Sequence, residues 1–122
     1  MKYGHILRDD MAAKVHYSDK SKNDLEEIGD YIAEELKNPS AAFRTVSRIQ
    51  DTIDKLTDFP LMGMLLSAIV EADTGDYRFL VCGKYIAFYR PQEENILIDR
   101  ILYGKRDYIA VLLHGLELDE MK

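Results

Sequence analysis

The sequence predicts an α+β domain in which a helical hairpin packs on one face of a small sheet formed by an N-terminal strand and a three-stranded antiparallel meander. Apolar residues recur at spacings of three and four in two successive segments between residues 18 and 59. Three segments rich in strand-forming residues follow between residues 77 and 103. A short strand precedes the helices. One layer of helices on one sheet is the simplest way to bury both apolar surfaces.

Composition limits the classes of protein to which the chain can belong. Its 122 residues suit one domain, and 47% hydrophobic with 31% charged residues is ordinary globular composition. No segment approaches the roughly 20 apolar residues of a membrane span, so we expect a cytoplasmic protein without membrane contact. Cys82 is the single cysteine, and no Cys/His cluster has metal-ligand spacing. We therefore expect neither a metal nor a cofactor.

Charge argues against broad attraction to nucleic acid, because the formal net charge is -6. Any contact with RNA or DNA must then be local. The basic residues of the C-terminal half lie between an acidic helical region and an acidic tail, and they permit a local basic patch: Arg78, Lys84, Arg90, Arg100, Lys105 and Arg106.

The N-terminal half predicts a strand and two helices. Residues 1–13 are interpreted as an extension or arm, and residues 14–122 as the single domain. Residues 14–17 alternate polar and apolar side chains as a strand does, and Ser18 is the expected N-cap of the first helix. Asn38-Pro39 ends that helix and begins the second. The two predicted core stripes are Leu25, Ile28, Ile32 and Leu36, and Ala42, Val46, Ile49, Ile53 and Leu56.

The C-terminal half predicts an antiparallel meander. Residues 61–75, which follow the Phe59-Pro60 helix exit, indicate a loop with a short extended piece. Residues 77–82 and 85–90 flank Gly83-Lys84, a two-residue hairpin turn. Residues 91–95 are turn-like, and residues 96–103 form the third consecutive strand.

The order of these elements and several short motifs resemble the RelE/ParE superfamily of toxins from type II toxin-antitoxin modules. The motifs are Asp24-Leu25 with Ile28, Phe59-Pro60, Asp76-Tyr77-Arg78, residues 85–90 and residues 100–108. The resemblance spans roughly residues 14 to 110. It implies the fold described above, a cognate antitoxin as partner, and either DNA gyrase or the ribosome with its mRNA as target.

RelE-like members cleave mRNA without a metal, and their catalytic positions are only partly kept here. The resemblance places Arg78 and Leu80 at the two lysine positions, Ile86 at the third-strand arginine, and Arg106 at the arginine of the Gly-Lys-Arg turn. The C-terminal tyrosine position falls near Leu112, for which Tyr108 or Tyr103 is the substitute. If the chain is a ribonuclease, its expected catalytic residues are therefore Arg78, Arg106 and Tyr108.

ParE-like members poison DNA gyrase, and the C-terminal half is closer to their pattern. An apolar strand ending Phe88-Tyr89-Arg90 precedes the segment Arg100 to Asp107, in which Tyr103 replaces a common histidine. This route needs a binding surface and no hydrolytic set, so the resemblance favours a gyrase inhibitor. Its expected binding residues are Arg90, Arg100, Tyr103 and Lys105. The alternatives are a ribosome-dependent endoribonuclease and a degenerate toxin that only binds an antitoxin.

A shared site requires that Arg78, Arg100 and Arg106 lie close together. The structural alternative is that Arg78 and Arg100 cross a sheet surface or pair with Asp99 or Glu94. Tyr103 and Tyr108 would then be packing residues at the edge of the sheet.

Overall fold

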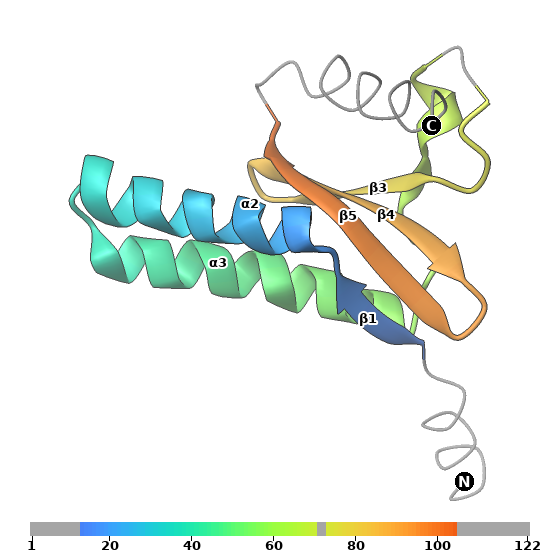
Figure 1. Cartoon of the computed structure of the whole chain (residues 1–122), viewed down its shortest axis with the longest axis horizontal. Helices are drawn as coiled ribbons and strands as arrows, with labels where there is room; N and C mark the ends of the chain where they lie inside the picture. Colours follow the sequence, from blue (N-terminus) through green and yellow to red (C-terminus); the bar gives the residue numbers. More distant parts are fainter. Residues whose placement is uncertain (1–12, 71–72, 105–122) are drawn as a thin grey trace, which may run out of the picture.

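The computed structural model describes residues 13–70 and 73–104 and shows a helical hairpin on one face of a five-stranded sheet (Figure 1). The predicted α+β class is confirmed. The helical elements are α2 (Asp19–Asp30), a π-helical turn (Tyr31–Glu35), α3 (Pro39–Asp54), and 3-10 turns at Lys55–Thr57 and Leu66–Ala68. The strands are β1 (Lys14–Tyr17), β2 (Met64–Leu65), β3 (Arg78–Cys82), β4 (Tyr85–Gln92) and β5 (Asn95–Tyr103).

The sheet has the order β1-β5-β4-β3-β2. The predicted meander of β3, β4 and β5 is confirmed, and β1 joins it parallel to β5. The extended piece expected within residues 61–75 is β2, which adds an antiparallel edge strand beside β3. Gly83 adopts φ 64°, as the predicted two-residue turn requires.

The turn predicted at residues 91–95 is shorter than expected. Pro91 and Gln92 continue β4, and the chain turns at Glu93 and Glu94, where Glu93 adopts φ 48°. Pairing between β3 and β4 ends at Arg78 opposite Tyr89. Pro91 therefore lies in a part of β4 that has only β5 beside it, and such an edge position tolerates a residue without an N–H.

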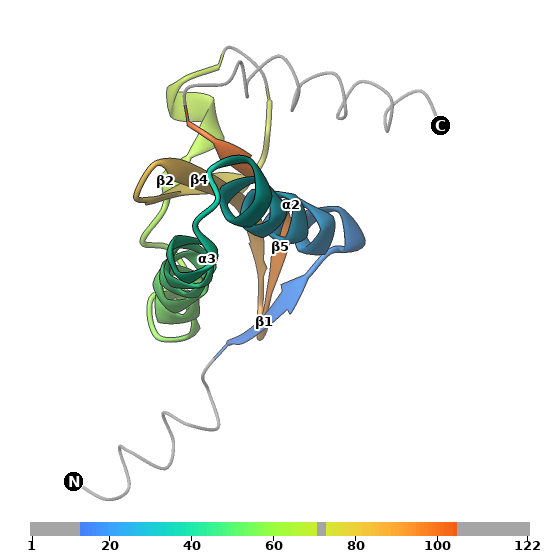
Figure 2. The ribbon, with the colours of Figure 1, turned by 90° about the vertical axis from the view of Figure 1, so that its left-hand side faces the viewer.

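Both helices begin at polar caps and lie on the same side of the sheet, as the view along the hairpin shows (Figure 2). The Ser18 hydroxyl accepts a hydrogen bond from the Ser21 N–H at 3.0 Å, which confirms the predicted N-cap. The Asn38 side chain likewise accepts from the Ala41 N–H at 3.1 Å, with Pro39 in the first turn. None of the described helices is long and apolar enough to cross a bilayer.

The first predicted core stripe is wrong at its last position. Leu25 and Ile32 are buried and Ile28 packs against the core, but Leu36 is 57% exposed. The hairpin projects past the end of the sheet (Figure 1), so the last turn of its first helix has no strand beneath it. The second stripe is confirmed: Ala42, Ile49, Ile53 and Leu56 are buried, and Val46 packs against them.

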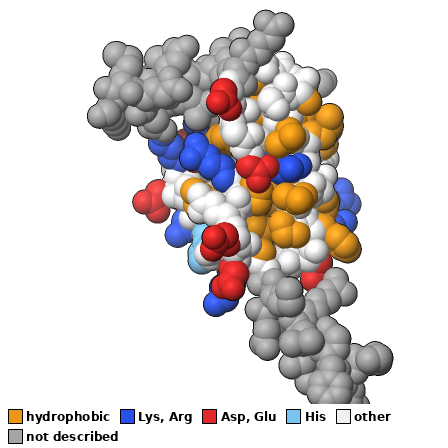
Figure 3. Space-filling model, turned by 90° about the vertical axis from the view of Figure 1, so that its right-hand side faces the viewer, with side chains coloured by type: hydrophobic (Ala, Val, Ile, Leu, Met, Phe, Trp, Pro, Cys, Tyr) orange, Lys and Arg blue, Asp and Glu red, His pale blue; other side chains and the backbone are white. Residues whose placement is uncertain are grey.

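The loop between α3 and β3 leaves apolar side chains in solvent. Phe59, Leu61, Met62, Met64, Leu65 and Ile69 are all exposed. Figure 3 shows the right-hand side of the molecule in Figure 1, where hydrophobic side chains gather with an acidic and a basic side chain among them. We call the six residues the β2 patch.

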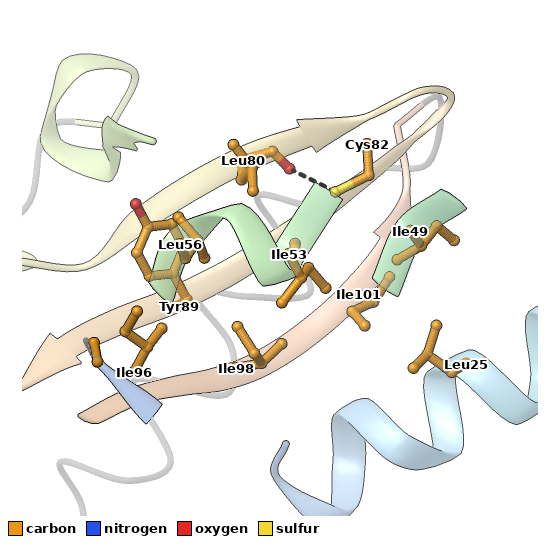
Figure 4. Packing of buried hydrophobic residues seen from close by; sticks show 12 residues of the cluster. Leu25, Ile49, Ile53, Leu56, Leu80, Cys82, Tyr89, Ile96, Ile98 and Ile101 are labelled. Atoms are coloured by element: carbon orange, nitrogen blue, oxygen red, sulfur yellow. Dashed lines mark hydrogen bonds between the residues drawn. The ribbon is translucent and has the colours of Figure 1, made fainter. Parts of the chain in front are cut away.

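Side chains are buried on both faces of the sheet. The larger core lies between the sheet and the helices, where Ile53, Leu56 and Ile98 come together with Tyr89 (Figure 4). The Tyr89 hydroxyl accepts a hydrogen bond from the Gly63 N–H at 2.9 Å and donates one to the Pro60 carbonyl at 2.8 Å. A second cluster occupies the opposite, outer face: Leu66, Tyr77, Phe79, Ile86, Phe88 and Leu102.

Ala13 is part of the larger core, and its N–H donates to the Thr57 carbonyl at 3.2 Å. The sequence places Ala13 in the N-terminal extension, but its burial shows that the packed domain includes at least this residue of that segment. Residues 1–12 lie outside the described part of the chain.

Tyr17 should make the protein sensitive to alkaline pH. Burial, aided by the negative charge of Asp54, raises the pKa of Tyr17 to about 12. Its hydroxyl is buried and has no hydrogen-bond partner among the described residues. An unfolded tyrosine releases its proton near pH 10, whereas the folded protein retains it. The stability contributed by protonated Tyr17 is therefore complete below about pH 10 and is lost as the pH approaches 12.

The measurement is the denaturation midpoint of wild type and Tyr17→Phe between neutral and strongly alkaline pH. At neutral pH we expect the two proteins to have similar midpoints, because Phe removes no hydrogen bond. Above about pH 10 the wild type should lose stability more steeply than the variant. Parallel curves over the whole range would show that the Tyr17 pKa is not raised.

Candidate functional site

A β-bulge in β5 turns two consecutive polar side chains toward the outer face of the sheet. Tyr89 lies opposite Ile98, but the neighbouring Phe88 lies opposite Arg100, so Asp99 is an extra residue in β5. Ile98 belongs to the core under the helices, whereas Phe88 belongs to the outer cluster. Cross-strand partners share a face, and Arg100 is therefore on the outer face with Phe88.

Tyr77 anchors a group of polar side chains on this outer face. Its hydroxyl donates a hydrogen bond to Oδ2 of Asp99 at 2.5 Å. Burial, followed by the negative charge of Asp99, raises the pKa of Tyr77 well above its usual value. The hydroxyl thus remains protonated and serves as a hydrogen-bond donor. It is unsuited to be the base that activates a ribose hydroxyl.

Arg90 is a predicted binding residue whose guanidinium donates no hydrogen bond to another described residue. Its guanidinium carbon lies 4.9 Å from the centroid of the Tyr77 ring, a cation–π contact. This ring contact is the one interaction of the Arg90 guanidinium within the described part of the chain. The half-buried side chain can therefore present its N–H groups to an external carboxylate or phosphate.

Arg100 is held by a carboxylate from the helical layer. Its Nε donates to Oδ2 of Asp24 at 2.8 Å and its Nη2 to Oδ1 at 3.0 Å, and the Ile101 N–H also donates to Asp24 at 2.9 Å. The hydrogen bond with Asp24 raises the pKa of Arg100. Asp24 is only 6% exposed. The pair links α2 to β5, and the partner of Arg100 is Asp24, not Asp99 or Glu94.

Arg78 has a structural position on the opposite face. Its Nε contacts Oδ1 of Asp76 at 3.1 Å, and its Nη1 donates to the carbonyls of Gly63 at 3.0 Å and Leu61 at 3.3 Å. These contacts hold the loop before β2 against Arg78 of β3. Arg78 lies opposite Tyr89, on the helix side, so the structure does not bring it together with Arg100.

The two RelE cation positions that carry apolar residues are packing positions here. Leu80 is 7% exposed in the core beneath the helices, and Ile86 is 8% exposed in the outer cluster. Lys105, Arg106, Tyr108 and Leu112 lie outside the described residues. Among the described residues, no group of histidine, cysteine and acidic side chains is suited to hold a metal ion.

Tyr103 borders a groove that the sequence did not predict. The groove has a volume of about 1230 Å³ and lies between the projecting end of the hairpin and the turn joining β3 to β4. Tyr31, Leu36, Lys84 and Tyr85 also line it, and the Tyr103 and Tyr85 rings are 5.6 Å apart. The apolar stripe that continues to Leu36 was only a partial signal, because the sequence does not show where the sheet ends.

The chain is similar to a toxin family in sequence and to chains of known toxin-antitoxin systems in fold. The family model described as the ParE toxin of the type II toxin-antitoxin system, parDE, matches residues 15–108. A search of curated proteins finds no match.

Two solved structures share the fold. A chain of the chromosomal ParDE toxin-antitoxin system from P. aeruginosa has a TM-score of 0.64 and 21% identity, covering 78% of this chain and 99% of that one. A chain of the RelBE2 toxin-antitoxin complex from Mycobacterium tuberculosis has a TM-score of 0.52 and 16% identity, covering 75% and 98%. With most of its length matched by the family model, the protein belongs to the ParE toxin family of type II toxin-antitoxin systems.

Proposed function

We propose that this toxin acts in the cytoplasm by inhibiting DNA gyrase and that a cognate antitoxin neutralises it. One observation carries the choice of gyrase over mRNA: Leu80 and Ile86 are buried apolar residues at positions where RelE has cations. Inhibition by binding needs no catalytic set, so these substitutions do not impair it. The match to the ParE family model supports the same choice.

The contacts of Arg78 and Arg100, two candidates that lie within the described residues, also favour binding over catalysis. Metal-independent RNA cleavage needs cations free to stabilise the crowded phosphate and a group able to take a proton. Arg78 holds a loop, Arg100 is paired with Asp24, and the Tyr77 hydroxyl stays protonated. Among the described residues the Arg90 guanidinium contacts only the Tyr77 ring, so we propose it as a contact to the target.

The groove beside Tyr103 supports the proposal of an antitoxin. Its apolar lining, which includes Tyr31, Leu36 and Tyr85, suits a segment that buries apolar side chains when it folds on the toxin. The gene product encoded beside the toxin is the expected partner.

The test is a supercoiling and DNA-cleavage assay with purified gyrase. The wild-type chain should inhibit supercoiling and trap cleaved DNA, and the antitoxin should relieve both effects. Arg90→Ala should raise the half-inhibitory concentration about tenfold, the equivalent of about 1.4 kcal/mol of binding energy. Arg44→Ala, which removes an exposed arginine from α3, is the matched control and should inhibit as the wild type does.

Translation extracts provide the opposing test. Ribosome-dependent cleavage of mRNA that is lost in Arg106→Ala, together with unaffected gyrase, would overturn the proposal in favour of a ribonuclease. Normal growth of cells that express the folded chain would instead identify a degenerate toxin that only binds its antitoxin.

A further inference from the structure

The β2 patch stands out because its segment of the chain contains no charged residue. Between 38% and 61% of each of its six side chains is exposed. Charged residues make up 31% of the whole sequence, yet residues 59–70 include none. Contiguous exposed apolar surface of this kind marks an interaction site, and methionines such as Met62 and Met64 adapt readily to a partner surface.

The patch includes an open edge of the sheet. β2 is the last strand beside β3, and the Leu66 N–H donates to the Tyr77 carbonyl at 2.8 Å. Hydrogen-bonded and non-hydrogen-bonded pairs alternate along an antiparallel ladder, so the next pair, Leu65 with Arg78, is of the other type. The N–H and C=O of Leu65 therefore point away from β3, to the side on which no described strand lies.

The two edges of the sheet differ in their protection. β1, the strand at the other edge of the sheet, exposes Lys14 and His16. A charged side chain such as that of Lys14 discourages the addition of a further strand. β2 carries no such residue, since both of its side chains are apolar and exposed. The edge of β2 is therefore available for pairing, whereas polar side chains protect the edge of β1.

Charge and shape identify the occupant. The net charge of -6 makes two copies repel each other, but an uncharged patch reduces that repulsion at the contact. The adjoining ion pair of Arg78 with Asp76 is internally neutral. The patch also spreads over the loops on both sides of β2, an area that one added strand would leave partly uncovered. A second copy brings a surface of equal breadth and the same chemistry.

We propose that the β2 patch is a two-fold interface between two copies of this chain. In a two-fold contact each copy uses the same surface. The Leu65 N–H of one copy donates to the Leu65 carbonyl of the other, and the reverse bond completes an antiparallel pair. The two sheets then continue into each other, and both sets of exposed apolar side chains are covered. This interface is independent of the target that the toxin binds.

The experiment measures the molar mass of the full-length chain by light scattering and sedimentation at protein concentrations up to about 100 µM. Wild type should rise from 14.1 kDa toward twice that mass. Leu65→Pro removes the outward N–H and suits the backbone, because Leu65 already has φ -62°. Met64→Lys places a charge on the edge. Both variants should raise the dissociation constant at least about tenfold while circular dichroism shows them to be folded.

Phe43→Glu is the matched control, because it adds a charge at an exposed apolar residue of α3, away from β2. It should associate as the wild type does. A wild-type chain that stays monomeric throughout the concentration range would overturn the proposal. So would a dimer that persists in both folded β2 variants, or one that is lost in Phe43→Glu alone.

Discussion

Replacing Asp24 with alanine is expected to lower the free energy of unfolding by about 3 kcal/mol, because it breaks a largely buried ion pair. The carboxylate accepts two hydrogen bonds from Arg100 and one from the Ile101 N–H. Alanine leaves all three donors without their acceptor. The Arg100 side chain is 24% exposed, so water partly compensates, and the expected loss is at the lower end for buried pairs.

The loss is measured by chemical denaturation of the isolated toxin. Glu26→Ala, an exposed acid on the same helix, is the control and should change stability by less than about 0.5 kcal/mol. In the double variant of Asp24→Ala with Arg100→Met, the combined loss should be smaller than the sum of the two single losses. Additive losses would mean that the two side chains do not stabilise each other.

Replacing Gly63 with alanine should have an effect of similar size for a steric reason. A Cβ atom at this position would lie 2.6 Å from the Tyr89 hydroxyl and 2.7 Å from the Phe79 carbonyl oxygen. Neither atom can easily move, because Phe79 belongs to β3 and the Tyr89 hydroxyl is bonded to Gly63 and Pro60. Overpacking at such a site costs about 3 kcal/mol.

The matched control is Gly29→Ala, for which the opposite sign is expected. Gly29 lies within α2, and an added Cβ would meet only Val46 at 3.5 Å, an ordinary contact. Alanine is favoured over glycine inside a helix by about 1 kcal/mol, so this variant should be slightly more stable than wild type. A Gly63→Ala protein with wild-type stability would show that the loop before β2 is not packed as described.

Local patterns in the sequence were sufficient for the helices and most strands. Ser18 and Pro39 define helix starts by side-chain chemistry that acts within a few residues, and the stripe from Ala42 to Leu56 follows helical periodicity. Each of these signals depends only on residues that lie close together in the sequence. The family resemblance was equally readable, since its motifs are short and occur in order.

Features that depend on contacts between distant segments were not predictable in the same way. The bulge at Asp99 breaks the two-residue alternation of β5, and it is visible only once β4 is paired with it. Leu36 has a core-like spacing, but its burial depends on how far the sheet extends. Arg78 and Arg100 resemble site residues in the sequence, whereas their partners, the Gly63 carbonyl and Asp24, lie 15 and 76 positions away.

The parallel pairing of β1 with β5 bears on how the toxin is made. Lys14 to Tyr17 pair with Asn95 to Ile98, so the first strand has no neighbour until most of the chain has been synthesised. The hydrogen bonds from Ser18 to Asp99 and from Arg100 to Asp24 join residues that are similarly far apart in the sequence. Contacts of such long range slow folding. An interrupted translation product should therefore lack the native fold, and the emerging chain should remain unfolded until its last strand is available.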